Sequence, residues 1–497
     1  MNLSWKNLLP ATIILFSGGP NAESSQPIPV ATTVSLVAGQ GGNDFNHTGE
    51  RFGVHGTDLG VMWRDSRGRT AIAFGDTYGE GWGGHGAGPD SADWRFTTLA
   101  HSTDTELTDG LGIDSMVTDR PGHAKQLLGR DPTVSEVTVI PTAGISVGGR
   151  DYLHYMSVRS WATGGRWTTN YAGLAYSDDG GVTWAKDAVT RWPNTGGSAR
   201  FQLGAFAHRD GFVYLFGTPN GRLGDGYLAR VAETSLLTID DYEYWTASGW
   251  RTGTADEAIP VMAGQVGELS VQYNTFLGAW VALHLDESRS AIVLRTAPGP
   301  TGPWSGGTVV ARGADHPGLY GSYLHPSSES ELYFAMSEWD PYHVKLLRFP
   351  LTGLPPSTNI AQDGDFEDPA LGPWRGAGNA GVDRGLGNAR SGKNNGWVHN
   401  TSGWNELAQH VVLRPGARYR LSGWIQSSAT TSDGYFGVRN GTFRVEQKFS
   451  RLPAYQRVSV EFTSSVAEAD IYAGVWAAGN QATWARIDDV TLENLDQ

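Results

Sequence analysis

Short pairs of strands, in which apolar and polar positions alternate, recur along the first two thirds of the chain. The clearest pair covers residues 59–63 and 70–74, and the R-D-S-R-G segment between them has the composition of a tight turn. Four further pairs share one plan, in which a strand opening on a polar or acidic residue leads through a short turn into an aromatic-rich strand. They are predicted at residues 136–140 and 152–158, 202–207 and 212–216, 268–273 and 279–285, and 320–325 and 332–336.

Each pair is followed by a further strand-like stretch, at residues 97–101, 171–176, 226–231, 290–296 and 344–349. The repeats are spaced by about 65 residues, which fits four short strands and a long loop. The pattern therefore predicts an all-β fold with a five-bladed β-propeller over residues 31–354. The strand predicted at residues 31–37 would close the ring by joining the last blade.

Two local motifs support this prediction. Residues 177–184, S-D-D-G-G-V-T-W, fit the Asp-box pattern S-x-D-x-G-x-T-W, a rigid turn between the outer strands of a propeller blade. In that turn Asp179 would accept hydrogen bonds from backbone amides and Trp184 would pack against the blade. Residues 296–305, T-A-P-G-P-T-G-P-W-S, resemble a blade-edge turn of glycoside-hydrolase propellers. Both motifs indicate scaffold.

The last part of the chain has a different pattern. A Pro-rich linker is predicted at residues 355–358, and alternation at residues 457–462 and 470–475 predicts a β-sandwich over residues 359–497. Its opening, N-I-A-Q-D-G-D-F-E, and its closing stretch, W-A-R-I-D-D-V-T-L, resemble jelly-roll carbohydrate-binding modules. The resemblance implies a sugar-binding domain, and a purely structural sandwich is the alternative. The side chains considered for it are Trp397, Trp404 and Trp476 for stacking on sugar, and Asp365, Glu367 and Asp488 as either ligands of a structural calcium ion or ordinary strand-end acids.

Composition narrows the range of functions. The chain has 497 residues, no cysteine and a net charge of −14, which excludes thiolate chemistry and disulfides and argues against nucleic acid as a partner. Residues 1–22 combine Lys6 with a short apolar run and small residues, which predicts a signal peptide and secretion. No other segment is long and apolar enough to insert into a membrane. The histidines lack metal-ligand spacing, so no cofactor is expected to be required.

The first hairpin carries the strongest chemical signal. Asp58 precedes its first strand and Asp76 follows its second, so the turn should bring the two side chains near-opposite each other. Two close carboxylates resist ionising together, which leaves one proton donor and one anion, as glycoside hydrolysis requires. Ordinary turn aspartates are the alternative reading.

The predicted propeller adds further acids to this pair. The inner strands of all blades start at the same end of the central channel, so the residues that open them should converge there. These residues are Asp58, Glu136, Gln202, Glu268 and Tyr320. Glu268 and Asp286 repeat the 18-residue spacing of Asp58 and Asp76. An acidic funnel is therefore predicted, with burial against Arg95, Arg159 or Arg295 as the alternative.

The loops around this funnel contain residue types that bind sugars. Aromatic rings stack on sugar C–H faces, and His and Asn side chains bond to hydroxyls. The predicted catalytic residues are Asp58 and Asp76, and the predicted substrate-binding residues are His55, Trp82, His85, Glu136, Trp161, Asn170, Glu268, Tyr320, His325 and Trp339.

Several separated motifs resemble a known family. They are G-T-D-L-G-V-M-W and A-F-G-D-T in the first hairpin, V-I-P-T-A-G, L-H-Y-M-S, G-E-L-S-V and Y-F-A-M-S. They resemble glycoside hydrolase family 183, the endo-D-arabinanases, formerly a domain of unknown function. The resemblance implies cleavage of α-linked D-arabinofuranose chains in arabinogalactan and lipoarabinomannan, and it places Asp58 and Asp76 on the family's paired aspartates.

Three functions remain open at this point. The first is a secreted endo-acting glycoside hydrolase that uses Asp58 and Asp76. The second is a non-catalytic, lectin-like propeller that binds glycans, and the third is a propeller glycosidase for another furanoside polymer such as L-arabinan. The expected closeness of the two aspartates favours a retaining mechanism, for which carboxyl groups lie about 5 Å apart. The sequence does not assign the acid, the product length or the oligomeric state.

Overall fold

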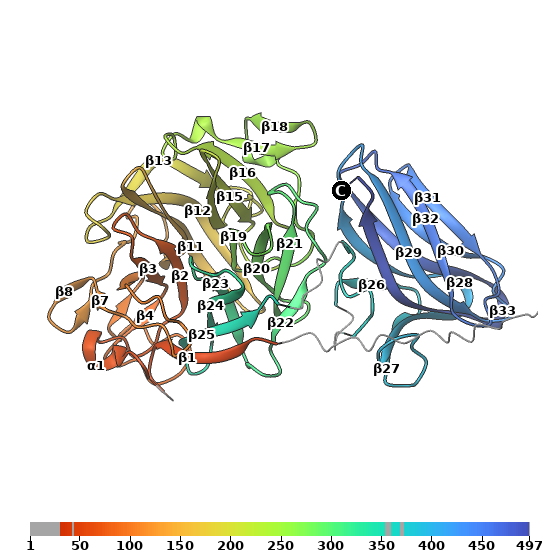
Figure 1. The fold of residues 1–497 in the computed structure, drawn as a ribbon, viewed down its shortest axis with the longest axis horizontal. Helices are drawn as coiled ribbons and strands as arrows, with labels where there is room; N and C mark the ends of the chain where they lie inside the picture. The colour runs from red at the N-terminus through yellow and green to blue at the C-terminus, as the bar shows by residue number, and fades with distance from the viewer. Residues whose placement is uncertain (1–29, 42–43, 353–358, 368–371, 497) are drawn as a thin grey trace, which may run out of the picture.

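The computed structural model describes residues 30–41, 44–352, 359–367 and 372–496 (Figure 1). Regular structure within these ranges is almost entirely β-strand. The exceptions are one short α-helix, α1 (Thr48–Phe52), and the 3-10 turns η1 (Ile239–Asp241) and η2 (Ala255–Glu257). No helix of the described residues is long and apolar enough to cross a lipid bilayer. The predicted signal peptide, residues 1–22, and the predicted linker, residues 355–358, lie outside the described residues.

Five antiparallel sheets form the propeller, which confirms the predicted fold class. The first three sheets, with their strands in order from the axis outward, are β2 (Leu59–Arg64), β3 (Thr70–Phe74), β6 (Thr98–Ser102) and β7 (Ser115–Met116); β10 (Thr138–Val147), β11 (Arg150–Ala162), β12 (Arg166–Ser177) and β13 (Ala185–Pro193); and β14 (Leu203–Arg209), β15 (Phe212–Thr218), β16 (Tyr227–Ala232), β17 (Glu243–Thr246) and β18 (Gly249–Thr252). The last two are β19 (Leu269–Asn274), β20 (Ala279–Asp286), β21 (Ala291–Ala297) and β22 (Thr308–Arg312); and β23 (Leu319–Leu324), β24 (Glu331–Glu338), β25 (His343–Pro350) and β1 (Thr32–Ala38).

The inner strands close into a ring. Strand β2 contacts β10, β10 contacts β14, β14 contacts β19, β19 contacts β23, and β23 returns to β2. The N-terminal strand completes the fifth blade as predicted, because β1 pairs antiparallel with β25, from Thr32 opposite Arg348 to Ala38 opposite Val344. In Figure 1 the red β1 lies beside the teal β25 at the bottom of the propeller. This pairing ties the two ends of the propeller together.

Short strand pairs and the Asp-box complete the propeller. The pairs are β4 (Thr77–Tyr78) with β5 (Trp94–Arg95), and β8 (Thr118–Arg120) with β9 (His123–Ala124). The Asp-box joins β12 and β13 as expected. Asp179 Oδ1 accepts hydrogen bonds from the amides of Val182 and Thr183, and the ring of Trp184 packs edge-on against Trp63.

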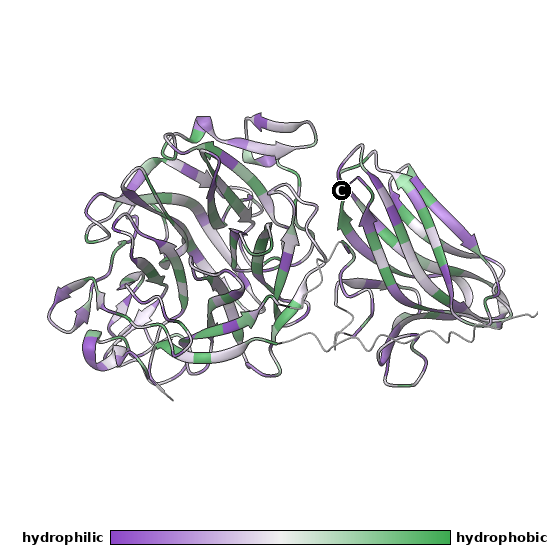
Figure 2. Cartoon of the chain, in the orientation of Figure 1, coloured by the Kyte–Doolittle hydropathy of each residue, from purple (hydrophilic) through white to green (hydrophobic). Residues whose placement is uncertain are grey.

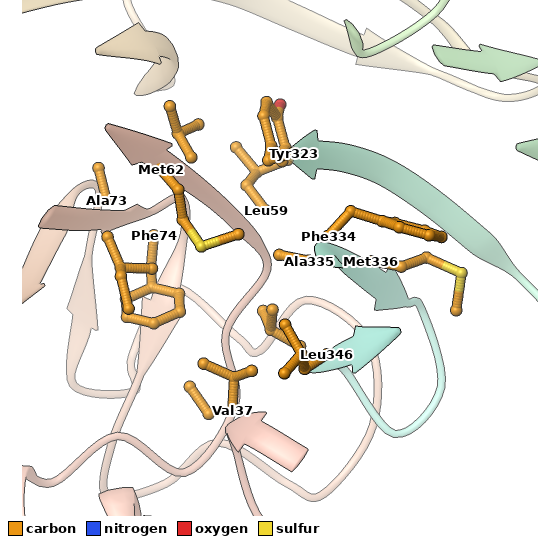
Figure 3. Packing of buried hydrophobic residues seen from close by; sticks show 14 of the residues in the cluster. Val37, Leu59, Met62, Ala73, Phe74, Tyr323, Phe334, Ala335, Met336 and Leu346 are labelled. Atoms are coloured by element: carbon orange, nitrogen blue, oxygen red, sulfur yellow. The ribbon is translucent and has the colours of Figure 1, made fainter. Parts of the chain in front are cut away.

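The core lies between the blades. Apolar residues run along the propeller strands in Figure 2, and Figure 3 shows how the first and fifth blades pack against each other. At that contact Leu59 and Phe74 of the first blade and Phe334 and Met336 of the fifth are buried. Each such side chain contributes about 1.5–3 kcal/mol of burial free energy, so this contact holds β2, which begins directly after Asp58, in a fixed position.

The C-terminal strands form the predicted β-sandwich, in one network of antiparallel pairs. They are β26 (Trp374–Ala377), β27 (Ala380–Arg384), β28 (Asn394–Val412), β29 (Arg418–Ser427), β30 (Gly434–Asn440), β31 (Phe443–Phe449), β32 (Gln456–Thr463) and β33 (Glu468–Asn494). The stretch that enters the sandwich contacts the fourth blade. Gln362 Nε2 donates to the carbonyl of Ala263 at 3.2 Å, and the amide of Gly306 donates to the carbonyl of Asn359 at 2.8 Å.

Candidate active site

A cavity of about 370 Å³ opens at the end of the central channel where the inner strands begin. Its wall includes Asp58 and Asp76 from the first hairpin, and it adds side chains from all the other blades. These are Ile140, Pro141, Thr142, Met156, Trp161, Arg166, Trp167, Leu203, Arg222, Glu268, Tyr320, Tyr323, Trp339 and Tyr342. The cavity therefore combines carboxyl groups with aromatic and apolar walls, the composition of a site for an uncharged ligand with polar groups.

The backbone of the first hairpin explains how both aspartates reach this cavity. The amide of Gly75 donates to the carbonyl of Asp58 at 3.1 Å, so Asp58 pairs with Gly75, and Asp76 lies one residue further on. The two aspartates are thus diagonal neighbours, whereas the sequence predicts them nearly opposite. A Cβ on Gly75 would collide with Asp58 Oδ1, so the missing side chain leaves room for the carboxyl group of Asp58.

Asp58 is held by tyrosines of the fifth blade. Tyr320 donates from its hydroxyl to Asp58 Oδ2 at 3.0 Å, and Oδ1 is buried with no hydrogen-bond partner among the described residues. Burial, reinforced by the charge of Asp76, raises the pKa of Asp58 to about 8, although the hydroxyl groups of Tyr320 and Tyr342 oppose the rise. At neutral pH this carboxyl group therefore carries a proton.

Asp76 has better partners for its charged form. Its Oδ1 accepts hydrogen bonds from Thr138 Oγ1 at 2.6 Å and from Trp94 Nε1 at 2.9 Å. Burial raises the pKa of Asp76 to about 6, while these two bonds and the more distant charge of Arg130 hold it down. Asp76 is therefore mainly an anion at neutral pH. No Lys or Arg of the described residues lies within ion-pair distance of either aspartate, so the alternative of burial against an arginine does not apply to this pair.

Several predicted substrate-binding residues lie in the same cavity. Trp161, Glu268, Tyr320 and Trp339 all line it. Trp161 and Trp339 are 48% and 50% exposed, so about half of each side chain is accessible to a ligand. Trp339 is supported by an edge contact to Tyr342, at 5.5 Å between ring centroids.

Other predicted residues lie elsewhere. Trp82 is buried, donates from Nε1 to the carbonyl of Gly86 and covers Gly56. His325 is fully buried at the opposite end of β23 and contacts Thr70 at 3.2 Å. His55 and His85 do not line the cavity; the amide of His55 donates to the carbonyl of Tyr78.

Glu136 and Asn170 are also outside the cavity wall. Glu136 Oε2 accepts the amide of Asp131 and lies 3.6 Å from Lys186 Nζ, and Asn170 donates to Ser157 Oγ. Strand β10 begins two residues after Glu136, at Thr138, and it is Thr138 that reaches Asp76. In the third blade Gln202 is fully buried and bonds to Thr169 and to the carbonyl of Trp192. Asp286 follows Glu268 by 18 residues, as Asp76 follows Asp58, but it accepts hydrogen bonds from Ser288 in its own turn.

The sequence did not single out Arg222, Tyr342, Thr138 or Trp94. Arg222 and Tyr342 come from loops that follow strands β15 and β24 and that have no repeating pattern. Thr138 and Trp94 are ordinary strand residues whose role depends on their contact with Asp76. Only the position of Thr138, at the start of an inner strand, carried a usable signal.

The sandwich has aromatic residues on its surface. Trp404 and Trp476 occupy directly paired positions of β28 and β33, and Trp476 is half-exposed. Trp397 lines a shallow pocket with Trp484 and Arg486.

Two of the predicted calcium ligands bind backbone instead. Glu367 Oε1 accepts the amides of Lys393 and Asn394, and Asp488 Oδ2 accepts those of Arg390 and Ser391. Within the described ranges no group of three or more His, Asp or Glu side chains could hold a metal ion.

Comparison with known proteins identifies relatives of the propeller. The model of a family described as "Domain of unknown function (DUF4185)" matches residues 43–348. Notoamide biosynthesis cluster protein J' of Aspergillus versicolor is 32% identical over 347 residues, which are 66% of this chain and 91% of the relative. Protein J of the same kind of cluster, from Aspergillus sp. (strain MF297-2), is 33% identical over 350 residues, which cover 66% of this chain and 89% of the relative.

Solved structures resemble the chain at low identity. A putative hydrolase from Bacteroides ovatus is 14% identical and covers 61% of this chain and 87% of its own, with a TM-score of 0.44. An exo-β-1,3-galactanase from Phanerochaete chrysosporium is 12% identical and covers 92% and 99%, with a TM-score of 0.39. A glycoside hydrolase family 43 arabinoxylan arabinofuranohydrolase from Bacillus subtilis is 12% identical and covers 93% and 100%, also with a TM-score of 0.39.

Proposed function

The chain belongs to the DUF4185 family, and we propose that it is a secreted, endo-acting glycoside hydrolase that cleaves α-D-arabinofuranosyl linkages in the D-arabinan of arabinogalactan and lipoarabinomannan. One observation carries this proposal. Two buried carboxyl groups, Asp58 and Asp76, line one cavity with pKa values of about 8 and about 6, on either side of neutrality. Hydrolysis of a glycosidic bond needs one carboxylic acid and one carboxylate.

The difference in pKa supports distinct roles for the two aspartates. Asp58 is the general acid: its proton passes to the glycosidic oxygen as the bond from the anomeric carbon to that oxygen breaks. Asp76 is the anion that faces the developing positive charge. It acts either as a nucleophile on the anomeric carbon, in a retaining mechanism, or as a base that takes a proton from the attacking water, in an inverting one. Thr138 and Trp94 position it by donating to Oδ1.

The walls of the cavity suit a neutral sugar chain. If Asp58 is protonated, the charged side chains of the wall are Asp76, Glu268, Arg166 and Arg222, so the two negative and two positive charges cancel. The half-exposed rings of Trp161 and Trp339 offer stacking faces for sugar residues beyond the reaction centre. The choice of D-arabinan rests on the sequence motifs that resemble those of the endo-D-arabinanase family.

Two further parts of the proposal concern location and the sandwich. Residues 1–22 would direct the chain to secretion, where cell-wall polysaccharides are accessible. The sandwich would bind the same polymer through surface tryptophans such as Trp476 and so raise the local substrate concentration.

Purified protein incubated with arabinogalactan, lipoarabinomannan and plant L-arabinan tests the proposal. We expect release of oligosaccharides from the first two only. We also expect no release by Asp58→Asn and Asp76→Asn variants that still unfold in one cooperative thermal transition, as folded protein does. Release from L-arabinan alone would make the chain an L-arabinanase. Binding of arabinans without release, unaffected by either substitution, would make it a lectin-like propeller.

A further inference from the structure

Arg222, in the loop between β15 and β16, clamps a third carboxyl group of the cavity. Its Nε and Nη2 both donate to the same oxygen, Oε1 of Glu268, at 3.0 and 2.9 Å. The guanidinium also lies over the ring of Tyr320, 5.1 Å from its centroid, and its backbone amide donates to the carbonyl of Gly165 at 3.0 Å. Arg222 is therefore fixed from several sides, and it fixes the orientation of Glu268 in turn.

The second carboxyl oxygen of Glu268, Oε2, has no hydrogen-bond donor among the described residues. Glu268 is 6% exposed, and Oε2 itself is buried. Both Glu268 and Arg222 line the cavity that contains Asp58 and Asp76. A buried carboxylate oxygen without a donor costs free energy, so such a group in a native site points to a donor that arrives with the ligand.

We propose that Glu268 and Arg222 form a hydroxyl-binding subsite for the neutral sugar unit beside Asp58. Glu268 Oε2 accepts a hydrogen bond from a ring hydroxyl, while Arg222 occupies Oε1 and holds the carboxylate in the required rotamer. Glu268 contacts substrate, and Arg222 is a positioning residue. This inference rests on the proposed glycan-cleaving function and adds to it the residue that selects a hydroxylated unit.

Geometry explains why this subsite is separate from the reacting pair. Tyr320 lies between the two: its ring is under Arg222 and its hydroxyl donates to Asp58 Oδ2. A sugar hydroxyl bound to Glu268 would thus fix the position of the sugar ring relative to Asp58, the proton donor. Glu268 itself would not contact the bond that breaks. Interactions of this kind lower KM more than they raise kcat when they are equally strong in the ground state and the transition state.

Glu268→Gln is the sharpest test, because the amide keeps an oxygen for Arg222 and replaces the unused acceptor by an NH2 group. We expect the KM for D-arabinan to rise about tenfold or more, with kcat within about threefold. The alkaline limb of the pH profile should move slightly to lower pH, because the charge of Glu268 contributes to the raised pKa of Asp58. Arg222→Lys keeps the charge but loses the two-pronged contact, so a smaller rise of about threefold to fivefold in KM is expected. Glu287→Gln is the matched control, since Glu287 lies 3.8 Å from Arg222, is one-third exposed and is outside the cavity wall.

Each outcome decides the inference. An unchanged KM in folded Glu268→Gln protein overturns it, as does a loss of kcat at constant KM, which would move Glu268 into the reaction itself. If Glu268→Gln protein does not fold, Arg222→Lys carries the same decision.

The same variants separate this inference from the proposed function. Calorimetry measures the binding of a panel of neutral oligosaccharides to two proteins. One is the Asp76→Asn variant and the other is the Asp76→Asn, Glu268→Gln double variant. If a glycan other than D-arabinan binds, and Glu268→Gln lowers its affinity about tenfold, the result refutes D-arabinan as the substrate but supports the subsite. If no neutral glycan binds, both are overturned.

Discussion

The hydroxyl of Tyr320 lies 3.0 Å from Asp58 Oδ2, although 262 residues separate the two in the sequence. Closure of the propeller ring brings them together, because β23 of the fifth blade contacts β2 of the first. The bond favours the charged form of Asp58, whereas burial and the charge of Asp76 favour the neutral form. The result is a carboxyl group whose pKa is raised to about 8, which sets the alkaline limit of the proposed reaction.

Tyr320→Phe should move that limit. The variant loses the hydrogen bond that stabilises the Asp58 anion, so the pKa of Asp58 rises further, and the alkaline limb of kcat/KM shifts upward by roughly half a unit to one unit. The pH dependence of kcat/KM measures this directly. Tyr333→Phe, which loses a bond to Glu331 at the far edge of the blade, should leave the limb in place. An unmoved limb in Tyr320→Phe would mean that another group sets it.

Thr138→Val should act on the acid side of the profile. Thr138 makes the hydrogen bond that does most to stabilise the Asp76 anion, so its loss raises the pKa of Asp76 above about 6. Activity then appears only at higher pH, and the acid limb of kcat/KM moves up. Thr138→Ser keeps a hydroxyl and should restore the original limb. If valine and serine behave alike at this position, the bond has no part in setting the charge of Asp76.

Asp58→Asn should stabilise the protein at high pH. The pKa of Asp58 is about 8 in the folded chain, against 3.8 ordinarily, so the contribution of this group to stability is greatest below about pH 4 and is lost as the pH rises towards 8. An amide carries no such penalty. With about 1.4 kcal/mol for each unit of pKa, we expect the free energy of unfolding of Asp58→Asn to exceed that of the wild type by about 5 kcal/mol at pH 8, and the difference to become small near pH 4.

Urea unfolding at the two pH values measures this difference. If Asp58→Asn is less stable than the wild type by the same amount at both pH values, Asp58 stabilises the fold. Its burial would then not be a loss of stability accepted for function.

Trp339→Ala should weaken binding of the polymer. The ring is half-exposed at the mouth of the cavity, so its removal costs stacking on sugar but little packing in the core. We expect KM to rise about tenfold with the unfolding temperature unchanged. Phe276→Ala, at an equally exposed ring in the turn between β19 and β20, is the control and should leave KM as it is. Equal KM values for both variants would exclude Trp339 as a stacking platform.

Much of the fold could be predicted because propeller strands repeat a local pattern. The predicted strand at residues 70–74 coincides with β3, and ring closure by the first strand follows from the same count of blades. The sandwich was predicted from alternation in the same way. The side chains of the site were harder, because a side chain's function depends on a contact between blades that no local pattern encodes.

Two pairs of residues show where prediction stops. Glu136 was expected at the start of the second inner strand, but β10 begins at Thr138, and a shift of two residues replaces a carboxylate by a hydroxyl beside Asp76. Trp82 and Trp339 look alike in the sequence. Trp82 covers Gly56 in the core, whereas Trp339 is half-exposed, and only the packing of their loops separates them.

The central claim is that Asp58 donates the proton and Asp76 acts as the anion. The most direct test compares two substrates in the Asp58→Asn and Asp76→Asn variants. An aryl arabino-oligosaccharide with a good leaving group needs no proton from Asp58, whereas natural D-arabinan does. We expect Asp58→Asn to lose at least about a thousandfold in kcat/KM on D-arabinan but to recover most of it on the aryl substrate, and Asp76→Asn to be inactive on both. Equal losses by Asp58→Asn on the two substrates, or cleavage of D-arabinan by Asp76→Asn at the wild-type rate, would contradict it.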